Sequence, residues 1–179
     1  MNASVNWHGN LSFTGSADTG FTIPLGASPA VGGENDGFRP LELMAVSLAG
    51  CTAMDVISIL KKKRQQVSDF RVEVHTDQAE NHPKVFTQAA IEYHVYGNDV
   101  DEKAVARALE LSATRYCPAQ AMLDHVFPIT LKYFIYDQGG QLLVSADYQP
   151  TDVYNAFCDR CVTPPEFKLR GSNNLFYPI

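Results

Sequence analysis

The hydrophobic and polar positions follow two periods along the chain, and together they predict strands at the start and then one long helix. Short alternating pieces separated by glycine-rich turns predict an antiparallel meander. Its strands are expected at Ser4–His8, Leu11–Thr14 and Phe21–Leu25. Pro40 suits the first turn of a helix, and the apolar run over Leu41–Gln66 predicts a single helix that closes on a basic tail.

The remainder of the chain returns to alternation, is interrupted by two helical patterns and then alternates again. Asp99 followed by Glu102 resembles a capping box and predicts a helix reaching about Thr114, and a shorter helix is expected from Pro118 to about His125. The alternating stretches predict two hairpins, one from Phe70–His75 with Phe86–Tyr96 and one from Phe127–Tyr136 with Leu142–Ala146. This order of elements predicts an α+β fold.

The pattern changes beyond Asp147, where prolines and glycines interrupt every period. We interpret residues 1–147 as one domain and residues 148–179 as an irregular extension that carries a C-x-x-C pair.

Composition narrows the class of protein. The 179 residues are 45% hydrophobic and 19% charged, which is ordinary for a globular domain, and the formal net charge of −6 argues against a nucleic-acid partner. The N-terminus shows no signal-peptide pattern, so we expect a cytoplasmic protein. Polar residues interrupt the apolar stretch Leu43–Leu60, which favours a buried core helix over a membrane span. We expect no membrane partner.

Two of the four cysteines occupy informative places, and the first is Cys51. At about 100° per residue it shares the one polar stripe of an apolar helix with Ser47, Asp55 and Ser58. Gly50 beside it leaves room for another backbone or a ligand. The alternative is a small buried cysteine that only packs.

Cys117 directly precedes Pro118, so it is expected to cap the following helix. There the free backbone N–H groups and the helix dipole favour a thiolate and lower the pKa of a thiol. A reactive or resolving thiol suits that place. The alternative is an apolar plug between Tyr116 and Met122.

The segment from Pro40 through Gly50-Cys51-Thr52-Ala53, followed later by Tyr116-Cys117-Pro118, resembles the OsmC/Ohr superfamily, named for osmotically inducible protein C and organic hydroperoxide resistance protein. The resemblance spans about residues 5 to 146 and is strongest to a branch with a Gly-Cys-Thr-Ala motif. It implies antiparallel sheets around a long central helix, an intertwined homodimer, and a thiol peroxidase that defends against oxidative stress. It also implies Cys51 as the peroxidatic thiol, Cys117 as the resolving thiol, a thiol reductant and no cofactor.

The resemblance departs from the family at the groups that activate the attacking thiolate. The family places a glutamate directly after the proline, where this chain has Leu41, with Glu42 one position later. The arginine of the family lies in the first meander, but here the first arginine is Arg39, which we take as the candidate activating group. A non-enzymatic stress-response or small-molecule-binding dimer is therefore the second hypothesis.

Cys158 and Cys161 form a lone C-x-x-C in the extension. One such pair is half a zinc site, and as a dithiol it would instead pass electrons to the central cysteines. Simple packing or a stabilising bridge is the third alternative. The histidines, His75 and His94 among them, are expected at the surface.

Overall fold

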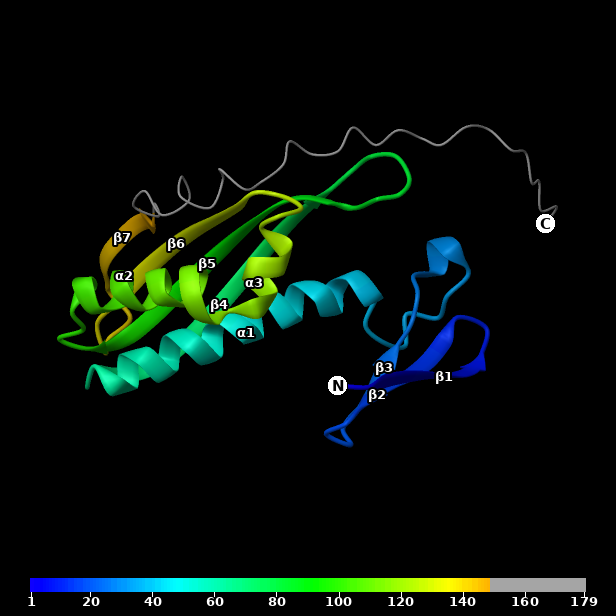
Figure 1. Ribbon diagram of the computed structural model, residues 1–179, viewed down its shortest axis with the longest axis horizontal. Helices are drawn as coiled ribbons and strands as arrows, with labels where there is room; N and C mark the ends of the chain where they lie inside the picture. The colour runs from blue at the N-terminus through cyan, green and yellow to red at the C-terminus, as the bar shows by residue number, and fades with distance from the viewer. Residues whose placement is uncertain (149–179) are drawn as a thin grey trace. The chain divides into compact units, whose positions relative to one another are not determined.

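The computed structural model describes residues 1–148, and these form an α+β fold with two separate sheets (Figure 1). This confirms the predicted class. In chain order the elements are β1 (Ala3–Gly9), β2 (Ser12–Ala17), β3 (Thr22–Leu25), the 3₁₀ turn η1 (Pro29–Val31), α1 (Pro40–Lys62), β4 (Gln66–Gln78), β5 (Phe86–Asn98), α2 (Glu102–Leu111), the π-helical turn η2 (Ser112–Tyr116), α3 (Pro118–Leu123), β6 (Ile129–Tyr136) and β7 (Leu142–Tyr148).

The first three strands form the predicted meander, an antiparallel sheet in the order β1-β2-β3. The turn between β1 and β2 places Gly9 and Asn10 at positive φ, 113° and 45°, a conformation that glycine and asparagine adopt most readily. The indole N–H of Trp7 donates to the Asn10 carbonyl at 2.8 Å across this turn.

The second sheet has the order β4-β5-β6-β7, and its two outer pairs are the two predicted hairpins. Its central pair, β5 and β6, is parallel, so the chain needs a long connection between them, and α2, η2 and α3 supply it. The helices gather on one side of this sheet (Figure 1). Because side chains alternate along a strand, Ile91, Tyr93 and Val95 of β5 are buried in the core. Glu92 and His94 face the other way.

Helix α1 packs with one side only. Its buried side chains recur at helical spacing, and α1 contacts β4, α2 and α3. These buried residues are Leu48, Thr52, Val56, Ile59 and Leu60. The expectation of a buried core helix therefore holds for this side of α1 alone, since Met44, Val46 and Met54 on its other side are exposed. By length and composition α1 is also apolar enough to cross a membrane, and 22% of its most apolar window is buried.

Two predicted helix boundaries are wrong. Helix α1 ends at Lys62 because Arg64 adopts a left-handed conformation, with φ of 59°, and the chain then enters β4 at Gln66. Helix α2 is capped by Asp101, whose carboxylate accepts from the Lys103 N–H at 3.0 Å. Asp99, the predicted cap, instead takes a positive φ of 52°.

A buried chain of hydroxyl groups joins α1 to β5 and η2. The Thr52 hydroxyl lies 2.7 Å from the Tyr93 hydroxyl and 2.9 Å from the Ser112 hydroxyl, and Ser112 donates to the Asp55 carboxylate at 3.2 Å. A carboxylate only accepts, so Ser112 donates its hydroxyl proton to Asp55. Thr52 must then donate to Ser112, and Tyr93 donates to Thr52. We call these four residues the Thr52 chain.

Candidate functional site

Cys117 caps α3 as predicted. Its backbone is extended, with φ of −78° and ψ of 102°, and its sulfur accepts from the Gln120 N–H at 3.4 Å. Its own N–H donates to the Ser112 carbonyl at 2.9 Å, which closes the π-helical turn η2. Turns of this kind are rare and occur often at functional sites. Cys117 is 2% exposed, so its thiol is almost inaccessible to solvent in the single chain.

Cys51 lies on α1 beside Thr52 and is partly exposed. Its thiol lies near enough to that of Cys117 to oppose the ionisation of Cys117, and both cysteines are free. The structure thus brings the two candidate cysteines together as a dithiol with one open member and one buried member. A small reagent meets Cys51 first, with Cys117 behind it.

The environment of Cys117 opposes ionisation. Burial is the main cause, with hydrogen bonding and charge at Cys51 and the Asp55 carboxylate acting in the same direction, and together they raise the pKa of the Cys117 thiol to about 12. The Gln120 N–H at the helix cap acts the other way but is outweighed. The expectation that the cap would lower this pKa is therefore wrong. Burial destabilises the Cys117 thiolate more than the single hydrogen bond from the Gln120 N–H stabilises it.

The Thr52 chain is the part of the site that sequence reasoning missed. Thr52 stands in the row of core-facing positions with Leu48 and Val56, and a hydroxyl in such a row needs a buried partner. That signal was present in the sequence, whereas the partners Tyr93 and Ser112 come from other elements. Burial is the main cause that raises the pKa of Tyr93, so its hydroxyl stays protonated and donates.

Gln120 follows Cys117 within the same turn and was also missed. It is 2% exposed, and its side-chain carbonyl has no hydrogen-bond partner among residues 1–148. An unpaired buried acceptor is costly. The cap of α3 thus holds one satisfied group, the Gln120 N–H on the sulfur, and one carbonyl free to accept.

Arg39 lies at the start of α1, where its guanidinium bonds the Glu42 carboxylate at 3.2 Å and Glu42 accepts from the Arg39 N–H at 3.0 Å. Twelve helical positions separate Arg39 from Cys51, roughly 18 Å along the axis. Within one chain Arg39 therefore does not reach Cys51. A role at the thiol stays a prediction that only Arg39 of a second copy would satisfy.

A separate cleft does not involve the two central cysteines. An open cleft of about 840 Å³ is lined by residues that include Arg39, Glu42, Lys84 and Phe86, and neither cysteine lines it. The predicted pair Cys158 and Cys161 lies outside the described residues, as does the extension from Gln149 onward.

The fold and site define a class: an α+β protein in which a long helix and a π-turn hold two free thiols together. Residues 33–132 match the OsmC-like protein family, and the chain belongs to that family. It is 35% identical over 133 residues to the protein YhfA of Escherichia coli K12, covering 74% of this chain and 96% of YhfA.

Solved structures agree on the fold. A hypothetical protein from Aquifex aeolicus is 29% identical with a TM-score of 0.67, covering 76% of this chain and 96% of its own. An organic hydroperoxide resistance protein OsmC from Legionella pneumophila is 18% identical with a TM-score of 0.53, covering 75% and 94%. At that identity the likeness shows the fold alone.

The raised pKa of Cys117 predicts a particular pH dependence of alkylation. Because the folded state disfavours the thiolate, iodoacetamide should label Cys117 slowly at pH 8 and faster only as the pH rises towards about 12. Mass spectrometry of the Cys117 peptide gives the rate, with the same chain in urea as the control. Labelling at pH 8 as fast in the folded chain as in urea would contradict the burial argument.

Proposed function

We propose that the chain is a thiol-dependent reductase of organic hydroperoxides that acts in oxidative-stress defence in the cytoplasm. The observation that carries the proposal is the partly exposed Cys51 thiol beside the buried Cys117 thiol. A two-step thiol peroxidase needs one sulfur open to the peroxide and a second sulfur behind it that closes the disulfide.

The reaction balances with these two residues. The Cys51 thiolate attacks the outer peroxide oxygen, the O–O bond breaks, and the alkoxide leaves and takes up a proton to become an alcohol. Cys51 is then a sulfenic acid. The Cys117 sulfur attacks it, a disulfide forms and water leaves. An external thiol reductant returns both cysteines to the reduced state and is itself oxidised to a disulfide.

The raised pKa of Cys117 supports its role as the second sulfur. A buried thiol that stays protonated does not compete for peroxide, so the first step falls to Cys51. Once Cys51 is a neutral sulfenic acid, the negative charge that it contributes as a thiolate is gone. One of the causes that raise the pKa of Cys117 is thereby removed, and its thiolate forms more easily for the closing step.

We further propose that the working unit is a homodimer, as the resemblance to the family implies. The exposed side of α1 carries Val46, Gly50 and Met54 at successive helical turns, with Met44 nearby. A Cβ built on Gly50 would meet nothing within 4 Å, so this chain alone does not require glycine there. A second α1 packed on this side would cover the apolar stripe and make use of the glycine.

A non-enzymatic binding dimer is the second candidate, and the charges favour it. The charged groups that act on Cys117 are Cys51 and Asp55, both negative when ionised, and Arg39 is engaged with Glu42. A thiol peroxidase needs a cation to stabilise the Cys51 thiolate. We propose that the second subunit of the dimer supplies this cation. The same experiment separates the two candidates.

Hydroperoxide should oxidise the two central cysteines in order. With one equivalent of cumene hydroperoxide, the wild-type chain should lose both the Cys51 and Cys117 thiols within minutes. Cys117→Ser should stop at a Cys51 sulfenic acid that dimedone traps, and Cys51→Ser should react no faster than a small thiol. Thiol titration and peptide mass spectrometry measure each outcome.

The double variant Cys158→Ser/Cys161→Ser is the control, because it removes the tail thiols and leaves the proposed site intact. It should lose the same two thiols as the wild type. If wild-type Cys51 stays reduced while small thiols react, the peroxidase proposal is wrong and the binding dimer takes its place.

The proposed dimer predicts a charge-sensitive interface on α1. Sedimentation equilibrium should give a dimer for the wild type and a monomer for Met54→Asp, because the substitution would bury a carboxylate between two apolar helices. Leu143→Asp, which makes the same kind of change on exposed β7, should remain dimeric. A monomeric wild type, or a dimeric Met54→Asp, would contradict the assignment.

A further inference from the structure

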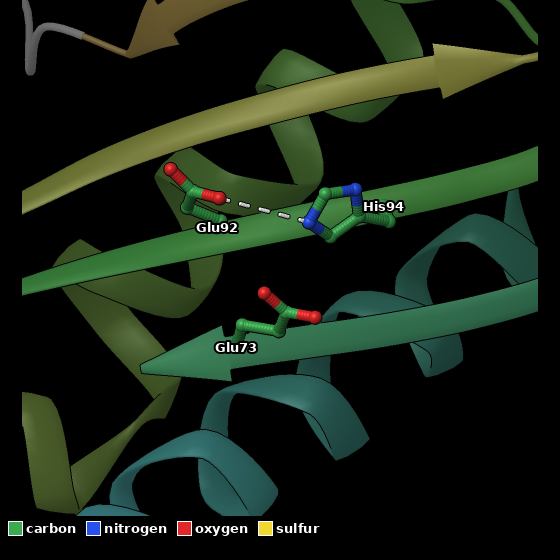
Figure 2. A group of neighbouring side chains, drawn as sticks. All are labelled: Glu73, Glu92 and His94. Atoms are coloured by element: carbon green, nitrogen blue, oxygen red, sulfur yellow. Dashed lines mark ion pairs between the residues drawn. The ribbon is translucent and has the colours of Figure 1, made fainter. Parts of the chain in front are cut away.

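On the outer face of the second sheet, two glutamates and a histidine converge (Figure 2). Glu73 on β4 stands directly opposite Glu92 on β5, and His94 follows two positions along β5 on the same face. Like charges directly opposite one another on neighbouring strands destabilise a sheet. One oxygen from each glutamate and a ring nitrogen of His94 lie within 4.8 Å of one another.

His94 is the unusual member of the group, because the sequence predicted a surface histidine and the structure buries it. Its side chain is 8% exposed, and its ring stacks on Phe134 with centroids 4.7 Å apart. Nδ1 lies 3.0 Å from the Tyr136 hydroxyl, whereas Nε2 has no hydrogen-bond partner among residues 1–148. Nε2 points towards the glutamates, 3.8 Å from the nearer Glu92 oxygen, which is too long for a hydrogen bond (Figure 2).

The ring of His94 is held at Nδ1 and leaves Nε2 without a partner among residues 1–148. In the tautomer that donates its Nδ1 proton to the Tyr136 hydroxyl, Nε2 presents a lone pair to the glutamates. A histidine whose other nitrogen is held by a hydrogen bond is the usual form of a metal ligand.

We propose that Glu73, Glu92 and His94 bind a divalent transition-metal cation of the zinc class. One imidazole nitrogen and two carboxylate oxygens suit zinc, whereas magnesium and calcium prefer oxygen ligands alone. The two carboxylates balance the charge of the ion, and three protein ligands leave a fourth position for water. The bound ion would be coordinated by the unpaired Nε2 and would remove the repulsion between the facing glutamates.

The group is open and closes around the ion. Zinc binds oxygen and nitrogen at about 2.0–2.2 Å, so its ligands must approach one another to within roughly 3.5 Å. Both glutamates have room to turn inward, since their side chains are 38% and 29% exposed. His94 is fixed by Phe134 and Tyr136 and sets the position of the ion.

Positive groups on the same face compete with the ion. Arg71 holds one Glu73 oxygen at 3.2 Å, and His75 lies 3.7 Å from the other. Lys132 is opposite Glu92 on β6, with its ammonium over the Phe134 ring. Glu73 is thus partly neutralised without metal, whereas Glu92 faces Glu73 on one side and Lys132, whose ammonium lies over the Phe134 ring, on the other. Removal of Arg71 should release Glu73 for the ion.

Isothermal titration of the reduced full-length chain with zinc chloride tests the site. The cysteines also take up zinc, so the decisive quantity is the difference between variants that keep every cysteine. Glu92→Gln and His94→Gln should each lose about one zinc equivalent per chain, and Glu80→Gln and His125→Gln, on exposed residues, should lose none. Arg71→Gln should bind zinc more tightly, and magnesium chloride should give no such difference between variants.

Glu92→Gln keeps the shape of the side chain, so it decides the question even if His94→Gln fails to fold. Equal zinc binding by wild type and Glu92→Gln would overturn the proposal. The outcome does not depend on the hydroperoxide experiment, because no cysteine changes.

Discussion

The Thr52 hydroxyl is the contact on which the rest of the site depends. It receives the Tyr93 proton from β5 and gives its own to Ser112 at the start of η2, so one side chain fixes the helix against the sheet and against the crossover. Cys51 is its neighbour on α1, and Cys117 closes the turn that Ser112 begins. A buried hydroxyl left unpaired costs about 1–3 kcal/mol. The hydrogen bonds of Thr52 therefore favour the arrangement of α1, β5 and η2 in which the two thiols lie side by side.

The same geometry explains how two chemically alike thiols take different parts. Cys51 is open on the polar stripe of α1, and Cys117 is sealed under the cap of α3, with Asp55 near enough to discourage a second negative charge. A protonated buried thiol behind an open one is suited to closing a disulfide rather than to meeting a peroxide. In the proposed peroxidase, a second subunit packed on the uncovered side of α1 would bring a cation to Cys51.

Sequence reasoning succeeded where the cause is local and failed where it is tertiary. Pro118 at the first position of a helix places Cys117 at the cap whatever surrounds it, so that prediction was confirmed. The pKa of that thiol was predicted in the wrong direction, because burial depends on the whole fold. The cluster of Glu73, Glu92 and His94 depends on strand register, which no single alternating segment reveals. Arg39 was expected to act on the distant Cys51, but its observed partner is local, namely Glu42 three residues along the chain.

The most direct test of the central claim is the equilibrium between the Cys51–Cys117 dithiol and its disulfide in a glutathione buffer. This equilibrium measures how closely the fold holds the two sulfurs. Thr52→Val should shift it several-fold towards the dithiol relative to the wild type, whereas Thr87→Val, the same change at an exposed strand position, should leave it unaltered. If Thr52→Val lowered the free energy of unfolding but left this equilibrium unchanged, the Thr52 chain would stabilise the fold without placing the cysteines, and the account would be contradicted.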